Sequence, residues 1–277
     1  MTTEKAVPAE REYALGTDRD ELIRLGFQHQ LWIEYAASAW DRAGFCPGDQ
    51  LLDVGCGPGH ATWDLAARVG ERGHVTAIDA SQRFIDHLQS QARLRGLTNV
   101  IATVGDVEKL RVSKRLFDGA YARWVLCFVR RPEAVIAGVA GALKSGGVFV
   151  VQDYFNYEGV LISPNCDIFK RVFKMVARSW RMRGGNPDVG GEVPSILSRC
   201  GFRVREIRPL VRAARPGSPL WQWPETFFAN YLPVLVELGL INESDRRAFD
   251  CEWRKRSRDP AAVFLTPPKL EVIAVKK

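Results

Sequence analysis

Short apolar runs alternate with longer amphipathic runs along most of this chain. The apolar runs predict five successive strands, at residues 50–54, 74–78, 99–104, 117–122 and 147–153. Between them, apolar residues recur at helical spacing in segments 60–69, 82–95 and 132–143. Strands that alternate with helices in this way are typical of an α/β protein with a largely parallel sheet.

The pattern loosens after residue 157. Helices are predicted over residues 160–183, 193–200, 221–237 and 244–256, and two further strands over 202–211 and 269–275. We therefore predict a doubly wound, seven-stranded, mostly parallel sheet of the Rossmann-like type. Insertions at about 157–200 and 215–266 are expected to form a helical lid above the carboxyl ends of the strands, where ligands of such sheets bind.

One more helix precedes the sheet. Thr17 and Asp20 resemble a capping box, and Gly44 is placed to end the helix. We expect residues 1–48 to form an N-terminal helical segment and residues 49–277 to form the main domain. The first residues carry no apolar signal-peptide core, which predicts a cytoplasmic protein. No apolar run reaches the ~18 residues of a membrane-spanning helix, so we expect no membrane span.

Composition and charge narrow the picture only slightly. Of the 277 residues, 46% are hydrophobic, which is ample for a buried core and excludes a disordered chain. The net charge of +7 permits an anionic ligand or nucleic acid without demanding either. The six cysteines form no C-x-x-C pair and the four histidines are not near paired cysteines, so we predict no metal site.

The sharpest motif is a glycine-rich turn that follows the first predicted strand. The segment reads Leu51-Leu52-Asp53-Val54-Gly55-Cys56-Gly57-Pro58-Gly59. Glycines let the backbone approach a ligand closely, and the next helix directs free N–H groups at it. Dinucleotide-binding loops read G-x-G-x-x-G, whereas this loop reads G-x-G-x-G and is preceded by Asp53. A tight turn without a ligand is the alternative interpretation of the loop alone.

Two carboxylates follow at the ends of the next two strands. Asp79 lies twenty residues after Gly59, where a carboxylate accepts hydrogen bonds from both ribose hydroxyls. Asp106, in Gly105-Asp106-Val107, is placed to accept from the amine of an adenine, with Val107 beside the ring. Alternatively, Asp79 is an N-cap of the helix that starts near Ser81. Taken together, the motifs predict an adenosine ligand that needs no pyrophosphate.

These motifs, with the Gly146-Gly147 turn before the fifth strand, resemble the class I S-adenosylmethionine-dependent methyltransferases. The closer likeness is to the small-molecule branch related to ubiquinone and menaquinone methyltransferases, and it is strongest over residues 50–153. The resemblance implies S-adenosyl-L-methionine as cofactor, and a context in secondary metabolism. A nicotinamide-dependent reductase of the same fold is the alternative.

The resemblance also implies roles for individual residues. Gly55 and Gly57 would pack against the methionine and ribose of the cofactor, and Asp53 would orient the loop or reach the amino group. The ribose and adenine would be bound by the residues that follow the second and third strands, namely Asp79, Ala80, Ser81, Gly105, Asp106 and Val107. The Arg123 backbone would approach the methionine amino group. Gln28 or His29, on an N-terminal helix that closes over the cofactor, would meet the methionine carboxylate.

Methyl transfer is an in-line displacement, so much of the catalysis can come from alignment in a dry site. Where the acceptor must lose a proton, His29 and Asp153 are the predicted catalytic bases. A structural role is the alternative for each.

The acceptor is expected to be a small organic molecule, aromatic or otherwise apolar, because the inserted regions are rich in Trp and Phe. Residues 122–125 read Ala-Arg-Trp-Val in place of the Pro-Pro-aromatic motif of nucleic-acid amino methyltransferases, so nucleic acid is not expected. The basic segment 246–258 is the one candidate contact for the phosphates of a nucleic acid. A cofactor-binding protein with a non-methylating activity, a non-catalytic partner role and a homodimer stay open.

Overall fold

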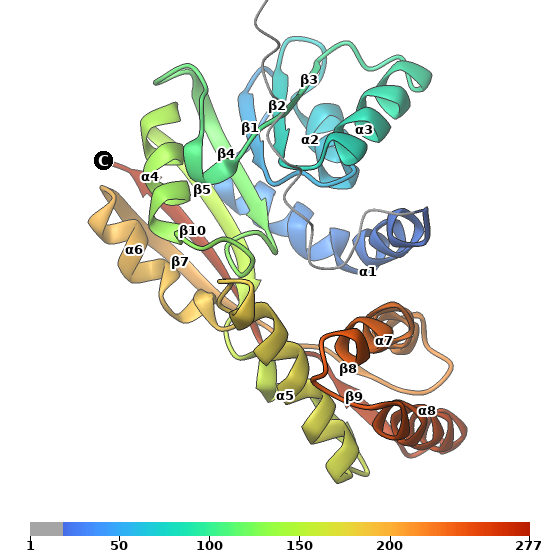
Figure 1. Cartoon of the computed structure of the whole chain (residues 1–277). Coiled ribbons are helices and arrows are strands. Elements are labelled where there is room, and N and C mark those ends of the chain that lie inside the picture. Colours follow the sequence, from blue (N-terminus) through green and yellow to red (C-terminus); the bar gives the residue numbers. More distant parts are fainter. Residues whose placement is uncertain (1–18) are drawn as a thin grey trace, which may run out of the picture.

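A computed structural model describes residues 19–277 of the chain (Figure 1). Its first element is helix α1 (Arg19–Ala43), which ends as predicted before Gly44, a residue with φ +84°. The predicted cap at Thr17 lies outside the described residues. Within residues 19–277, no helix is both long and apolar enough to cross a membrane.

A seven-stranded sheet forms the centre of the molecule (Figure 1). Its strands are β1 (Gln50–Val54), β2 (His74–Asp79), β3 (Val100–Val104), β4 (Phe117–Arg123), β5 (Leu143–Tyr154), β7 (Phe202–Leu210) and β10 (Lys269–Lys276). The order across the sheet is β3-β2-β1-β4-β5-β10-β7, and every neighbouring pair from β3 to β5 is parallel. β10 runs antiparallel to both β5 and β7. The predicted seven-stranded, mostly parallel sheet is therefore confirmed.

Helices cover both faces of this sheet because its strands are apolar on both sides. The helices that pack on individual strands are α2 (His60–Val69), α3 (Gln82–Leu94), α4 (Pro132–Ala142) and α6 (Val193–Arg199). Tyr121, Val150 and Ile273 pack with α1 and α2 on one face. The alternate residues of the same strands, among them Ala122 and Val151, point to the opposite core.

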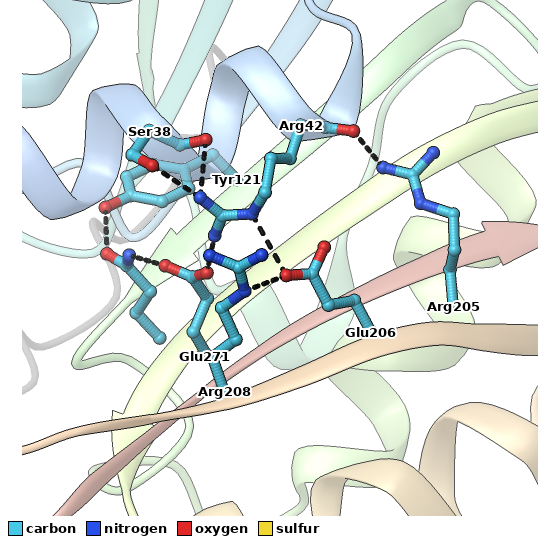
Figure 2. Close-up of polar contacts among 8 residues, drawn as sticks. Ser38, Arg42, Tyr121, Arg205, Glu206, Arg208 and Glu271 are labelled. Atoms are coloured by element: carbon cyan, nitrogen blue, oxygen red, sulfur yellow. Dashed lines mark hydrogen bonds and ion pairs between the residues drawn. The ribbon is translucent and has the colours of Figure 1, made fainter.

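Buried polar side chains attach α1 to the sheet (Figure 2). The Arg42 guanidinium contacts Glu206 at 3.0 Å and also pairs with Glu271, whose side chain is only 1% exposed. The Gln152 amide donates to Glu271 at 2.7 Å and accepts from the Tyr121 hydroxyl at 2.8 Å. Breaking a buried charged network of this kind is costly. The second half of α1 is thus fixed, and its first half is held over the carboxyl ends of β1 and β4.

A second group of elements lies beyond the carboxyl ends of β4 and β5 (Figure 1). Helices α5 (Asp167–Met182), α7 (Pro219–Glu237) and α8 (Glu243–Arg258) pack through aromatic rings, including Phe169, Phe228 and Phe249. They accompany a small antiparallel sheet of β6 (Leu161–Ser163), β9 (Val263–Leu265) and β8 (Ala213–Ala214). Single-turn 3-10 helices occur at η1 (Val107–Lys109), η2 (Tyr157–Gly159) and η3 (Val189–Gly191).

The structure corrects the prediction in this second half. The helix predicted over 160–183 begins only at Asp167, because residues 161–163 pair with β9 and Pro164 cannot donate a backbone hydrogen bond. The small sheet was not predicted. Helix α6, which the prediction counted in the lid, instead packs against α4 and β7 of the main sheet.

Candidate active site

A cavity of about 510 Å³ opens at the carboxyl ends of β1, β2 and β4, beneath the first half of α1. It brings together all but one of the residues predicted to bind the cofactor, namely Gln28, Asp53, Gly55, Gly57, Asp79, Ala80, Ser81, Asp106, Val107 and Arg123. His29 lies in the same wall. Gly105 does not line the cavity; its backbone N–H donates to the Asp79 carbonyl at 2.9 Å.

The glycine loop forms the floor of this cavity. Gly55 and Gly57 have φ angles of +67° and +54°, which side-chain-bearing residues rarely adopt. A Cβ added to Gly55 would lie 2.6 Å from Val125, so the loop needs glycine there for packing. A Cβ added to Gly57 would meet no protein atom within 4 Å. Because Gly57 lines the cavity, the space above it is space for a ligand.

Asp53 and Asp79 are the two carboxylates that lie beside the glycine loop. The buried Asp53 carboxylate accepts a hydrogen bond from the Thr62 hydroxyl at 2.6 Å, and burial raises its pKa to about 6. Asp79 accepts from the Gly57 backbone N–H at 2.8 Å and from the Ser81 N–H at 2.9 Å. Burial also raises the pKa of Asp79. Asp79 thus fixes the loop, Asp53 connects β1 to α2, and both residues line the cavity.

The adenine end of the predicted site is built from two short turns. Ser81 is the N-cap of α3, accepting from the Phe84 N–H at 3.3 Å, so the alternative of Asp79 as that cap does not hold. Asp106 begins η1 by accepting from the Glu108 N–H at 2.9 Å. Asp106 and Val107 both line the cavity beside this turn.

The Arg123 side chain was missed by the sequence prediction, which used only its backbone. Its Nη2 lies 2.8 Å from His29 Nδ1. Its Nη1 is buried and has no hydrogen-bond partner among residues 19–277. Arg123 as a residue lines the cavity, so its guanidinium charge suits an anionic group of a ligand there.

His29 has both ring nitrogens engaged. Nε2 lies 2.7 Å from the Asp64 carboxylate, and Nδ1 faces Arg123. Burial is the largest cause of a lowered His29 pKa, opposed by the hydrogen bond to Asp64. The imidazole is also stacked on His60, with ring centroids 5.7 Å apart.

Asp153, the second predicted base, does not line this cavity. Its Oδ2 accepts from the backbone N–H groups of Val125, Leu126 and Cys127 at 2.8–3.2 Å, and its Oδ1 accepts from its own neighbour Tyr154. Burial raises its pKa to about 6. The location corrects the prediction of a base: this carboxylate holds the turn after β4 and is turned away from the cavity.

An aromatic pocket of about 50 Å³ adjoins the cavity. The two share Gln28, Trp124, Phe128 and Trp180 in their walls. The remaining walls of the pocket are mostly aromatic and include Tyr154, Tyr157, Trp223, Phe227, Phe228 and Phe264. The abundance of aromatic residues in the insertions was visible in the sequence, but not which of them face this pocket.

Trp124 stands at the boundary between the two spaces. Its φ of +55° is unusual for a residue with a bulky side chain, and such conformations concentrate at functional sites. The indole is stacked near Trp223, with centroids 6.2 Å apart. Gln28 completes the boundary, because its Oε1 accepts from Trp223 Nε1 at 2.8 Å and from Arg24 at 3.0 Å.

The cavity fits an adenosine that carries an amino acid. Carboxylates at the ends of β2 and β3 suit the ribose hydroxyls and the adenine amine, and the open space over Gly57 suits close approach of the ligand. The guanidinium charge of Arg123, which lines the cavity, suits a carboxylate. S-adenosylmethionine has each of these groups.

Comparisons with known proteins agree with this geometry. Residues 46–196 match a family model described as a methyltransferase domain. The chain is 28% identical over 201 residues to a sterol 24-C-methyltransferase of Eremothecium gossypii, which covers 72% of this chain and 51% of that protein. It is 32% identical over 100 residues to the aklanonic acid methyltransferase of a Streptomyces species, covering 36% of this chain and 46% of the relative. The chain spans about half the length of the curated relatives it matches.

Solved structures show the same fold. A geranyl diphosphate C-methyltransferase from Streptomyces coelicolor superposes with a TM-score of 0.58 at 18% identity, covering 90% of this chain and 77% of the other. The [4+2]-cyclase SpnF superposes with a TM-score of 0.58 at 20% identity, covering 88% and 80%. Because the family model matches more than half of its residues, this chain belongs to the family of methyltransferase domains, and its cofactor is S-adenosylmethionine.

Proposed function

We propose that this chain transfers a methyl group from S-adenosylmethionine to a small apolar or aromatic acceptor. The observation that carries the proposal is the shared wall of Gln28, Trp124, Phe128 and Trp180 between the cofactor cavity and the aromatic pocket. A ligand in each space would meet its neighbour along that wall. The relatives named as sterol and aklanonic acid methyltransferases support an acceptor of this class.

In this proposal the cofactor is held by the residues that line the cavity. Asp79 accepts from the ribose hydroxyls, Asp106 and Val107 contact the adenine, and the glycine loop underlies the ribose and methionine. The guanidinium of Arg123, a residue of the cavity wall, binds the methionine carboxylate. Gln28, whose Oε1 is already engaged by Trp223 and Arg24, orients the wall between cofactor and acceptor.

When bound, S-adenosylmethionine supplies a methyl group that the positive charge on sulfur has already activated. The chain's own contribution is then alignment and exclusion of water. The indole and phenyl rings of the pocket provide an apolar surface that orients the acceptor. Because the carboxylate of Asp153 and both nitrogens of His29 are engaged within the protein, we assign both residues to positioning.

The helix before β1 and the elements beyond β4 and β5 are proposed to enclose the two ligands. We propose that α1 closes one side of the cavity and that α5, α7 and the small sheet form the lid over the acceptor. We also propose that nucleic acid is not the acceptor, because the pocket walls are mostly aromatic or apolar and their one cation among the described residues, Arg24, is paired with Glu21. A cytoplasmic location and a homodimer remain proposals; the six free cysteines favour a reducing compartment.

The test is transfer of a labelled methyl group from S-adenosylmethionine to a panel of small aromatic, terpenoid and amine compounds. We expect label in at least one extracted small product, and a Trp223→Ala variant that still binds S-adenosylhomocysteine should lose most of it. S-adenosylhomocysteine binding without transfer to any compound would instead favour a cofactor-binding protein with a non-methylating role. Label in nucleic acid would overturn the proposed acceptor class.

A further inference from the structure

Three side chains from three different elements form a continuous chain beside the cofactor cavity. Asp64 of α2 lies 2.7 Å from Nε2 of His29 on α1, and Nδ1 of His29 lies 2.8 Å from Nη2 of Arg123 at the end of β4. Of the three, His29 and Arg123 line the cavity and Asp64 does not. Asp64 faces an outer groove that it shares with His60 and His87.

The donors and acceptors of this chain fix one state of the imidazole. A guanidinium has N–H groups and no acceptor, so Nδ1 of His29 must offer its lone pair to Arg123. Nε2 therefore carries the proton and donates it to the Asp64 carboxylate. The charged or titratable groups that face the ring are Asp64, Arg123 and His60, and the lowered pKa of His29 agrees with a neutral ring.

The far end of the chain, Arg123, forms part of the cavity wall. Arg123 uses Nη2 for His29, and its Nη1 is buried without a partner among the residues that the structure describes. A guanidinium on its flexible stem loses rotamer freedom when it binds a ligand, and holding it beforehand reduces that cost. The imidazole of His29 provides such a hold, and Asp64 keeps that imidazole in the accepting tautomer.

Given S-adenosylmethionine as the bound cofactor, as proposed above, we propose that Asp64 and His29 are positioning residues that aim Arg123 at the carboxylate of its methionine. Asp64 does not line the cofactor cavity, so its effect on Arg123 is exerted wholly through the imidazole of His29. The three residues also connect α1 to α2 and β4, so the N-terminal helix and the carboxylate end of the site are ordered together.

The experiment compares two ligands that differ at this one end. S-adenosylhomocysteine carries the amino acid, whereas 5′-methylthioadenosine lacks it and keeps the adenosine. Both are titrated calorimetrically into the wild type, His29→Leu, His29→Asn and Asp64→Leu, with His74→Gln as a matched histidine control. His74 begins β2 and lines neither ligand space.

We expect His29→Leu and Asp64→Leu to bind S-adenosylhomocysteine about tenfold more weakly, the effect of disturbing one charge-assisted hydrogen bond. Their affinity for 5′-methylthioadenosine should stay within about twofold of the wild type. His29→Asn should recover part of the loss, because its amide oxygen can replace Nδ1 as the acceptor. The control should bind both ligands normally.

Equal losses for both ligands, or none for either, would overturn the positioning role while leaving the cofactor assignment intact. A wild type that binds neither ligand would overturn the proposed function, and the positioning role with it. A second readout needs no ligand: ¹⁵N NMR of the free protein should show His29 protonated at Nε2 in the wild type. The opposite tautomer would contradict the proposal.

Discussion

The carboxylate of Asp79 accepts a hydrogen bond from the backbone N–H of Gly57, at 2.8 Å. The residue proposed to bind the ribose therefore also holds the loop on which the cofactor lies. Since Gly57 has a φ of +54° and open space above it, this bond keeps an unusual backbone conformation in place. Ribose recognition and loop geometry are joined in one side chain.

Replacing Asp79 should for this reason weaken cofactor binding. In Asp79→Ala the ribose hydroxyls lose an acceptor and the Gly57 N–H loses its partner, which should cost about 1–3 kcal/mol of binding free energy. Calorimetric titration with S-adenosylhomocysteine measures this cost. Asp86→Asn, on the exposed side of α3, is the control and should bind normally. Unchanged affinity of Asp79→Ala would refute the ribose assignment.

A side chain at Gly57 should block the site without destroying the fold. Gly57→Val places its branches in the cavity, whereas Gly96→Val has a similar φ of +64° and equally open surroundings but lies away from the cavity. Both variants should lose a similar amount of stability, about 1–2 kcal/mol for the strained backbone. Only Gly57→Val should fail to bind S-adenosylhomocysteine. Normal binding by that variant would place the cofactor elsewhere.

The raised pKa of Asp153 predicts a pH dependence of stability. Its pKa is about 6 in the folded protein against 3.8 for the unperturbed group, so the folded state binds more protons between these values. The contribution of this group to the free energy of unfolding is therefore greatest below pH 3.8 and is lost as the pH rises to about 6, by up to about 3 kcal/mol.

The measurement is urea unfolding of the wild type and Asp153→Asn between pH 4 and 7. The wild type should lose more stability than the variant as the pH rises through this window. Parallel pH profiles for the two proteins would show that Asp153 titrates at its ordinary pKa.

The aromatic pocket should determine the affinity for the acceptor and leave the cofactor site unaffected. Trp223 lines the pocket but not the cofactor cavity, and it stacks near Trp124. Trp223→Ala should raise the KM for a methylated acceptor about tenfold or more, since burial of a large apolar surface is lost. Affinity for S-adenosylhomocysteine should hold within about twofold. A weaker affinity for S-adenosylhomocysteine with an unchanged KM for the acceptor would mean that the acceptor binds elsewhere.

The sheet and the adenosine end of the site could be predicted because they depend on local patterns. In a parallel sheet the carboxyl ends of the strands meet at one edge, so Asp53, Asp79 and Asp106 were expected together, and the cavity contains all three. Asp153 carried the same signal of a polar residue ending a strand. Asp153 differs from these three residues because the backbone N–H groups of the turn after β4 donate to its carboxylate, which does not line the cavity.

The missed features depend on contacts between distant segments. Asp64 lies 35 residues from His29 in sequence, and nothing local pairs them. The strands β6, β8 and β9 span two or three residues each, too few to show a period. Which aromatic side chains face the acceptor pocket follows from how α5 packs on η2 and how α7 packs on α1 and α5, a tertiary arrangement that no local pattern specifies.

The central claim is that this cavity is built for S-adenosylmethionine. Calorimetric titration of the wild type with S-adenosylhomocysteine, NADH and NADPH in parallel tests it most directly. The structure predicts binding of S-adenosylhomocysteine alone, lost in Gly57→Val. Binding of a nicotinamide nucleotide, or equal binding of S-adenosylhomocysteine by Gly57→Val, would contradict the account.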